Sequence, residues 1–169
     1  MNTGSMYCFS APFGWCGLAG GAAGLQKIYL PEPDRRVLLD RMKAEFPEAR
    51  CTDAAFSEVA SQLKKYFSGE IPSFTSRLDY GRATAFQKRV WQAAQTITYG
   101  QVRTYGWLAG RIGKPGAMRA VGAALGRNPF PIIIPCHRVI RADGGLGGFS
   151  AAEGIALKKK LLELEGAPL

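Results

Sequence analysis

A cysteine and a histidine stand next to each other where an apolar run ends. Residues 132–134 are three isoleucines, and they lead through Pro135 into Cys136 and His137. A thiol attacks as its thiolate, and a neighbouring base or positive charge supplies that form. We expect the isoleucines to form a buried strand. Because adjacent side chains of a strand point to opposite faces, the chain must turn after Pro135 for His137 to serve Cys136, directly or through one water.

The alternative interpretation of this pair is a buried, inert cysteine beside an incidental histidine. The chain has a single histidine, and its place next to a cysteine at an expected strand end favours a nucleophile. The other cysteines, Cys8, Cys16 and Cys51, are too few and too scattered for a disulfide framework. One histidine also gives no spacing typical of a zinc site. We therefore expect free thiols, no bound metal and a reducing, cytoplasmic compartment.

The excess positive charge lies in the second half of the chain. Residues 1–80 hold nine basic and nine acidic side chains, whereas residues 81–169 hold thirteen basic and four acidic ones. Between Asp79 and Asp143 there are ten lysines and arginines and no carboxylate. A stretch of one sign favours a polyanionic partner, most often nucleic acid, over a basic surface that only aids solubility. No apolar run approaches the ~20 residues of a membrane span, and no secretory leader opens the chain, so we expect neither a membrane protein nor a secreted one.

The first half has the pattern of a small α/β domain with an antiparallel meander. Its β-like runs, which turn sequences separate, are residues 6–9, 15–18 and 25–30. Two amphipathic helices are expected next, the first opening at Asp34 and the second at Asp53. Residues 68–82 then have few periodic apolar side chains and are expected to connect the halves. The first expected domain therefore spans residues 1–82.

The second half, residues 83–169, predicts helices joined by turns. Thr84 and Gln87 form a capping-box pattern ahead of a helix of about three turns. Thr104 is positioned to cap a second helix, and a break rich in glycine and proline precedes a third helix over residues 117–126. This order is the outline of a helix-turn-helix module, although short helices joined by glycine turns are also ordinary packing units.

The third of these helices consists mostly of alanine and glycine, with Arg119 and Arg127 as its long polar side chains. A helix with average side chains is about 10–12 Å across, whereas the minor groove of B-form DNA is about 6 Å wide. A helix that enters this groove must therefore lack bulk. Close packing of the small residues on another helix explains the same composition.

The second half resembles the methylated-DNA–protein-cysteine methyltransferases, the family that repairs O6-alkylguanine. The resemblance is nearly continuous from Phe86 to Gly166 and weaker in the first half, through residues 11–14 and 24–25. In the second half it lies in residues 90–91, 99–100, 104–105, 108–109, 119–122, 128–129, 131–132, 134–139, 147–150 and 161–166.

The resemblance implies a fold and a reaction. The fold is α/β (α+β), with a ribonuclease-H-like domain over residues 1–82 and a winged helix-turn-helix-like alkyltransferase domain over residues 83–169. The reaction moves the alkyl group of O6-alkylguanine irreversibly to Cys136, once per protein molecule, and leaves O4-alkylthymine open as a second substrate. The partner is double-stranded DNA that contains the lesion, the protein is a monomer, and no cofactor or metal takes part. Some relatives bind zinc in the first half, but this chain's one histidine belongs to the active site.

Five residues of the chain match catalytic positions of the family. Cys136 matches the alkyl acceptor, and His137 matches the base that takes the thiol proton through a water. Glu165 matches the carboxylate that orients the imidazole. Asn128 matches a hinge residue before the cysteine segment. Its alternative role is to end a helix before Pro129. Tyr105 matches the residue that donates towards N3 of the extruded guanine; without the resemblance it is a core aromatic.

Further residues match positions that contact DNA or line the base pocket. Arg119 matches the finger that enters the duplex and replaces the flipped nucleotide. The other DNA-binding positions, beside Tyr105, are Lys114, Ala120 and Gly122. The pocket positions are Val139, Ser150 and Ala151.

The segment after Gly148 departs from the family. Residues 149–152 read Phe-Ser-Ala-Ala where the family usually has Tyr-Ser-Gly-Gly, and the approach to the last helix is about two residues longer. Alanine in place of glycine takes space beside the pocket, and costs more if residue 151 requires a positive φ. The assignment of Glu165 depends on the Leu-Glu-Gly ending beyond this insertion.

Two other function classes compete with alkyl transfer. One is a non-catalytic relative that binds alkylated bases, but such proteins lack the acceptor cysteine. The other is a winged-helix regulator with a redox-sensing Cys136, which would need a resolving cysteine or a dimer signal that the sequence does not offer.

Overall fold

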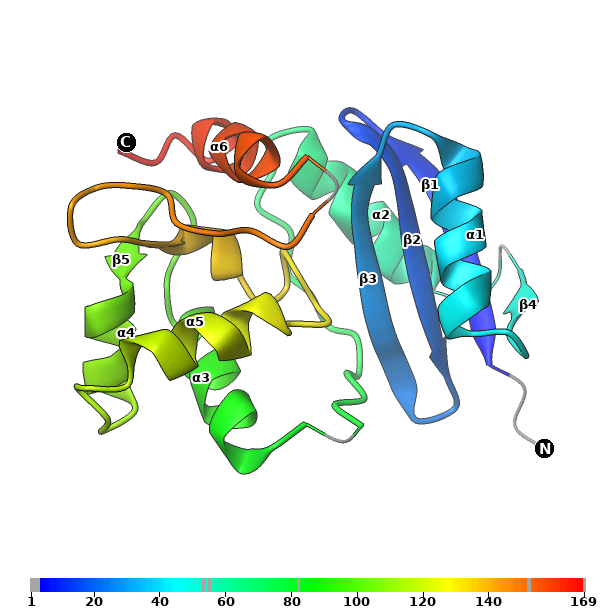
Figure 1. Ribbon diagram of the computed structural model, residues 1–169. Helices are drawn as coiled ribbons and strands as arrows, with labels where there is room; N and C mark the ends of the chain where they lie inside the picture. The colour runs from blue at the N-terminus through cyan, green and yellow to red at the C-terminus, as the bar shows by residue number, and fades with distance from the viewer. Residues whose placement is uncertain (1–3, 53, 55, 82, 152, 169) are drawn as a thin grey trace. The chain divides into compact units, whose positions relative to one another are not determined.

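The computed structural model describes residues 4–168 except 53, 55, 82 and 152, and it divides the chain into two compact units. The first is Met1–Gly81 and the second is Arg82–Leu169. The boundary expected from the sequence, after residue 82, is thus one residue later than the boundary in the structure. Both units are shown in Figure 1. Among the described residues, no helix is long and apolar enough to cross a membrane.

The sheet of the first unit confirms the expected antiparallel meander. Strands β1 (Ser5–Ala11), β2 (Gly14–Gly21) and β3 (Gly24–Glu32) pair in sequence, and β4 (Arg50–Cys51) adds to β1 in parallel. The strand order is β3-β2-β1-β4. The alternation of side chains along these strands presents one apolar set to each face of the sheet.

One helix covers each face of this sheet (Figure 1). Helix α1 (Arg35–Glu45) begins as predicted after Asp34, whose carboxylate accepts the Arg36 N–H at 2.7 Å. Its buried side chains pack with Met6, which lies on the opposite side of β1 from Phe9. Phe9 faces the other helix, α2, with Lys64 Nζ 5.6 Å from its ring centroid.

The second helix begins later than predicted, and the predicted connector pairs with β3 near its end. The N-cap of helix α2 (Ser57–Phe67) is Phe56, in a left-handed conformation, three residues after the predicted opening at Asp53, which itself lies outside the described residues. The end of the connector is held along β3, since the N–H of Leu25 donates to Arg77 and its carbonyl accepts from Asp79. The predicted connector, although it lacks apolar periodicity, therefore pairs with β3 through backbone hydrogen bonds.

The second unit consists of short helices around a two-stranded sheet. In chain order its elements are α3 (Ala85–Gln95), β5 (Arg103–Thr104), α4 (Tyr105–Arg111), α5 (Met118–Gly126), a 3-10 helix (Cys136–Arg138), β6 (Val139–Ile140) and α6 (Ile155–Leu164). The capping box of Thr84 and Gln87 is present, and the Thr104 hydroxyl accepts the Trp107 N–H at 3.1 Å. Both sequence-based caps are therefore confirmed.

The predicted strand over residues 132–134 is wrong. Ile132 has a φ of 75°, the Ile134 N–H donates back to the Phe130 carbonyl at 2.8 Å, and the segment makes only an isolated bridge. Pro131 and Pro135 flank the isoleucines and offer no N–H, so too few donors remain for a ladder. The isoleucines at 132 and 134 are still buried. Apolar composition correctly indicated burial and wrongly indicated a strand.

Candidate active site

Asn128 ties the turn after α5 to the cysteine. Its Nδ2 donates to the Ile134 carbonyl at 2.9 Å and to Cys136 Sγ at 3.2 Å, while its Oδ1 accepts the Phe130 N–H at 2.9 Å. One amide thus spans eight residues and touches the sulfur. Asn128 also stands just beyond the end of α5, so both of its expected roles are compatible with this position.

Cys136 is the first residue of the 3-10 helix and is 9% exposed. Burial raises the pKa of its thiol, because a buried thiolate loses its hydration. The Asn128 amide, the Lys158 cation and nearby backbone N–H groups act in the opposite direction, and burial prevails. The sulfur is therefore a protonated thiol at rest, and its proton must leave before it can attack.

His137 is fully buried and its Nε2 lies 2.7 Å from Glu165 Oε1. Burial lowers the pKa of the imidazole, and the Glu165 carboxylate opposes that effect without overcoming it. The ring is therefore neutral. A neutral ring beside an ionised carboxylate carries its hydrogen on Nε2, which leaves the lone pair on Nδ1 and makes the imidazole a proton acceptor.

Glu165 follows α6 and accepts hydrogen bonds from three residues. Besides His137, Arg138 donates its Nε to Oε2 at 2.8 Å and its Nη2 to Oε1 at 3.0 Å, and the Gly100 N–H donates to Oε2 at 3.1 Å. The carboxylate that was assigned from the Leu-Glu-Gly ending, Glu165, thus contacts the His137 imidazole in the structure. Sequence reasoning assigned no site role to Arg138.

Lys158 is the second site residue that sequence reasoning missed. It is fully buried in α6, and its Nζ donates to the Val139 carbonyl at 2.6 Å and lies 5.9 Å from the Tyr105 ring centroid. Burial lowers the pKa of the Lys158 ammonium to about 8. The run of three lysines at 158–160 suggests a solvated segment, but residues 158 and 165 lie two helical turns apart and share a face. That spacing was the available signal.

Tyr105 begins α4 close to the cysteine segment. Burial raises the pKa of its hydroxyl, and the electrostatic effect of Cys136 acts in the same direction. Strand β5 ends at Thr104 and pairs in parallel with β6, which follows the 3-10 helix, so the sheet links the start of α4 to the cysteine. Tyr105 also lies close to Gly147, where a Cβ added to the glycine would stand 2.8 Å from the tyrosine hydroxyl oxygen.

Apart from Tyr105, which begins α4, the predicted DNA-binding residues lie on α5 and in the turn before it. Lys114, Arg119 and Ala120 are exposed, and Gly122 is half-buried against the Tyr105 ring. The packing explanation of the small residues applies to one face of the helix, and the groove explanation stays a prediction for the exposed face. Ala124 is buried and its carbonyl accepts the Trp91 indole N–H at 2.9 Å, so this face packs on α3. The outer face remains thin.

The predicted pocket residues fall into two groups. Val139 is buried and holds Lys158, whereas Ser150 and Ala151 lie in the irregular segment between β6 and α6. Among the described non-glycine residues, only Phe56 and Ile132 have a positive φ, so Ala151 carries no such backbone strain. Ala151 therefore does not carry the extra cost that alanine would have at a position requiring a positive φ.

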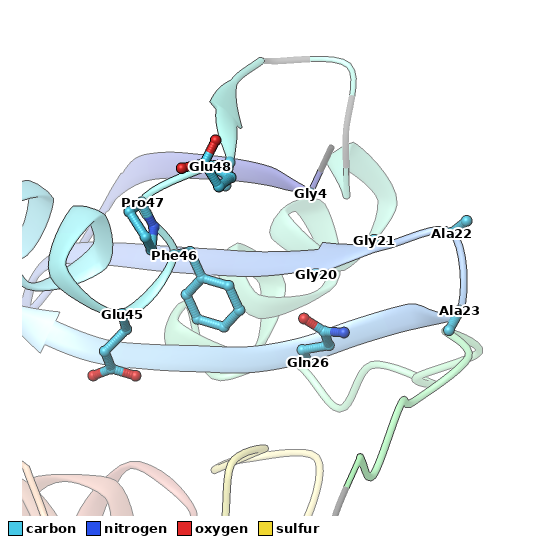
Figure 2. A pocket seen from close by; sticks show the side chains of 11 residues that line it. Gly4, Gly20, Gly21, Ala22, Ala23, Gln26, Glu45, Phe46, Pro47 and Glu48 are labelled. Carbon is cyan, nitrogen blue, oxygen red and sulfur yellow. The ribbon is translucent and has the colours of Figure 1, made fainter. Parts of the chain in front are cut away.

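A separate hollow of about 420 Å³ lies in the first unit, between the β2–β3 turn and the end of α1. Figure 2 shows Gln26, Glu45, Phe46 and Glu48 around it. None of the predicted site residues lines this hollow. Among the residues that the structure describes, no group of three or more His, Cys, Asp or Glu side chains is arranged to hold a metal ion.

Comparisons with known proteins place this geometry among alkyltransferases. Residues 85–167 match the family described as "6-O-methylguanine DNA methyltransferase, DNA binding domain". The methylated-DNA–protein-cysteine methyltransferase of Methanosarcina acetivorans is 43% identical over 160 residues, 94% of this chain and 96% of the relative. The crystal structure of Mycobacterium tuberculosis OGT in complex with DNA gives a TM-score of 0.80 at 43% identity, covering 97% of this chain and 95% of that one. The O6-methylguanine-DNA methyltransferase of Pyrococcus kodakaraensis KOD1 gives 0.75 at 28% identity, covering 96% and 99%.

Proposed function

Since this chain belongs to the methylated-DNA–protein-cysteine methyltransferase family, we propose that Cys136 is the residue that receives the alkyl group. The protein is a direct-reversal DNA repair enzyme that takes the alkyl group of O6-methylguanine in DNA onto a cysteine. The observation that supports Cys136 as acceptor is its position beside the His137–Glu165 pair, with the Asn128 amide on its sulfur.

The reaction is a single displacement that begins with a proton transfer. The Cys136 proton passes through one water to Nδ1 of the neutral His137, while the Nε2–H of His137 keeps its hydrogen bond to Glu165. The thiolate attacks the alkyl carbon in line with the C–O6 bond, that bond breaks, and both of its electrons leave with guanine. The Tyr105 hydroxyl donates towards N3 and stabilises the departing anion. A thioether remains on Cys136, and no step restores the thiol.

DNA is the partner, and the substrate form that we propose is a duplex containing O6-alkylguanine. The thin outer face of α5 suits the minor groove, and Arg119 projects from it to fill the space of the flipped nucleotide. Lys114, which is exposed in the turn before α5, neutralises a phosphate. We further propose that the protein acts as a monomer in the cytoplasm, or in the nucleus if its source is eukaryotic.

The intact mass of the protein after reaction with an O6-methylguanine duplex tests the acceptor. We expect a gain of one methyl group, located on the peptide that carries Cys136, and no gain for Cys136→Ala. A methyl group on another cysteine would overturn the assignment. Binding of the duplex without any mass gain would instead make the protein a non-catalytic reader of alkylated DNA.

The Arg119 finger is tested with two substrates. Arg119→Ala should slow transfer from duplex DNA far more than transfer from the free O6-alkylguanine base, because only the duplex requires extrusion. Lys88→Ala, which removes a cation from helix α3 instead, is the matched control. Equal losses on both substrates would remove Arg119 from this role.

A further inference from the structure

Three ionisable side chains form a compact cluster behind the cysteine. They are His137, Arg138 and Glu165. The side chains of His137 and Glu165 are fully buried. The proposed reaction uses His137 and Glu165. Arg138 does not touch the sulfur, yet it makes two of the hydrogen bonds to the carboxylate that orients the base.

Arg138 is itself held from several sides. Its Nη1 donates to the Ile97 carbonyl at 2.6 Å, and its guanidinium carbon lies 5.7 Å from the Tyr99 ring centroid. Only 11% of its side chain is exposed. A guanidinium with this fixed, two-point contact on a carboxylate is a strong and specific pair, which a flexible surface cation would not reproduce.

The cluster compensates its own charge. Glu165 contributes one negative charge and Arg138 one positive charge, so the neutral His137 is not needed as a counter-ion. With Arg138 removed, a buried carboxylate 2.7 Å from the ring would favour a proton on the imidazole. The remaining groups near His137 are the Cys136 thiol and the Lys158 cation, while Tyr99 lies beyond the guanidinium.

We propose that Arg138 is a positioning residue that keeps Glu165 ionised and charge-compensated, so that His137 is neutral at rest and ready to receive the Cys136 proton. The proposal rests on the proposed role of His137 as the base. It means that the state with both a thiol and an imidazolium, which cannot begin the reaction, is disfavoured at neutral and mildly acidic pH. Arg138 thereby extends the reactive range towards lower pH.

The single histidine of the chain makes the test direct, because its imidazole signal in an NMR titration is unambiguous. Arg138→Met should raise the pKa of His137 by about one pH unit or more, to above its ordinary value of about 6.5. Mere loosening of the site would bring it only to that ordinary value. Arg138→Gln removes the same charge with a donor retained, for use if the methionine variant does not fold.

Two further variants test whether charge sets the pKa of His137, because one should lower this pKa and the other should leave it low. Glu165→Gln should lower the pKa of His137 further, whereas loosening would raise it. Arg138→Lys should keep it below 6.5, because the charge remains. Arg141→Met is the matched control, since Arg141 pairs with Asp143 at the exposed surface and should leave the imidazole unchanged.

The reaction of Cys136 provides the second readout. Its rate with iodoacetamide, followed by peptide mass against pH, should show the acidic limb displaced to higher pH in Arg138→Met, with about a tenfold loss at pH 6. A His137 pKa at or below 6.5 in the neutral variants, or an unmoved limb, would overturn the proposal. Neither measurement needs DNA, so a failure of methyl transfer would overturn the proposed function and leave this result standing.

Discussion

Two buried cysteines, one in each unit, show what separates a structural thiol from a reactive one. Cys16 in β2 is 1% exposed, and burial raises the pKa of its thiol, with Cys8 as the other contributor in the same direction. Burial raises the pKa of Cys136 as well, but there a side-chain amide, a cation and backbone N–H groups act against it. Burial alone therefore protects a thiol, and directed donors around a buried sulfur make it usable.

Ion pairs in the two units differ in the same way. Lys27 and Glu45 in the first unit form a pair whose side chains are 33% and 41% exposed, which is worth roughly 0–1 kcal/mol. The pair of Arg138 and Glu165 is desolvated, so loss of either partner leaves a charge buried without compensation. The Lys27–Glu45 pair is a surface pair, whereas the Arg138–Glu165 pair belongs to the site.

Replacement of each cysteine gives the largest expected contrast. Cys136→Ala should abolish methyl transfer and retain duplex binding, because the proposed acceptor sulfur is lost while the exposed residues of α5 remain. Cys16→Ala should keep the full transfer rate and lower the free energy of unfolding by about 1 kcal/mol. Single-turnover rates with an O6-methylguanine duplex and urea unfolding measure these outcomes. A transfer rate for Cys16→Ala below half of the parent rate would contradict the division of roles.

Replacement of Lys158 should weaken the reactive thiol without removing it. Lys158→Met removes the cation that favours the Cys136 thiolate, so we expect the transfer rate at pH 7 to fall by about 10- to 100-fold. Lys159→Met is the matched control, since Lys159 is 61% exposed and pairs with Glu163 on the same helix. Equal rates for the two variants would show that the buried cation is not needed.

The same residue should give stability a distinct pH dependence. The ammonium of Lys158 has a pKa of about 8 in the folded protein and 10.5 in an exposed chain, so between these values the unfolded chain binds more protons. Stability contributed at this site should therefore rise as pH increases from 8 to 10.5, by up to about 3 kcal/mol. Urea unfolding across this range should show the rise in the parent and in Lys159→Met. Its persistence in Lys158→Met would assign it to another group.

A methyl group at Gly147 should disturb Tyr105 by contact. Gly147 has a φ of 73°, and an added Cβ would stand 2.8 Å from the Tyr105 hydroxyl oxygen. We expect Gly147→Ala to slow transfer by about tenfold, and more for O6-benzyl than for O6-methyl substrates. Gly144→Ala has a similar φ in open space and Gly148→Ala has neither problem, so they separate strain from contact. A loss as large in Gly144→Ala would exclude the contact.

The smallest effect is expected at Ala151. Because this residue has no positive φ, Ala151→Gly relieves no backbone strain and changes only the space beside the pocket. We expect the ratio of O6-benzyl to O6-methyl rates to rise by less than about threefold, below the roughly tenfold that a methylene group in an enclosed pocket can give, because Ala151 is only partly buried. A fall in the ratio would show that the alanine methyl contacts the substituent favourably.

Local patterns predicted much of the fold because their physical causes are local. The caps at Thr84 and Thr104 depend on hydrogen bonds to residues three positions on, and the capped helices formed as expected. The isoleucines at 132–134 misled because composition reports burial, whereas a strand also needs donors that the flanking prolines lack. The left-handed Phe56, just before α2, has no sequence signal of its own.

Three features could be read from the amino-acid sequence alone: the cysteine–histidine pair, the excess of positive charge in the second half and, through resemblance, the remote Glu165. Two contacts became visible only in the folded chain: Arg138 meets a carboxylate 27 residues away, and Lys158 meets a carbonyl 19 residues away. Both residues are cations, a residue type that is rarely buried unless it is paired. The reason is that a side chain's protonation and role depend on the groups packed around it, and distant parts of the chain bring those groups together only on folding.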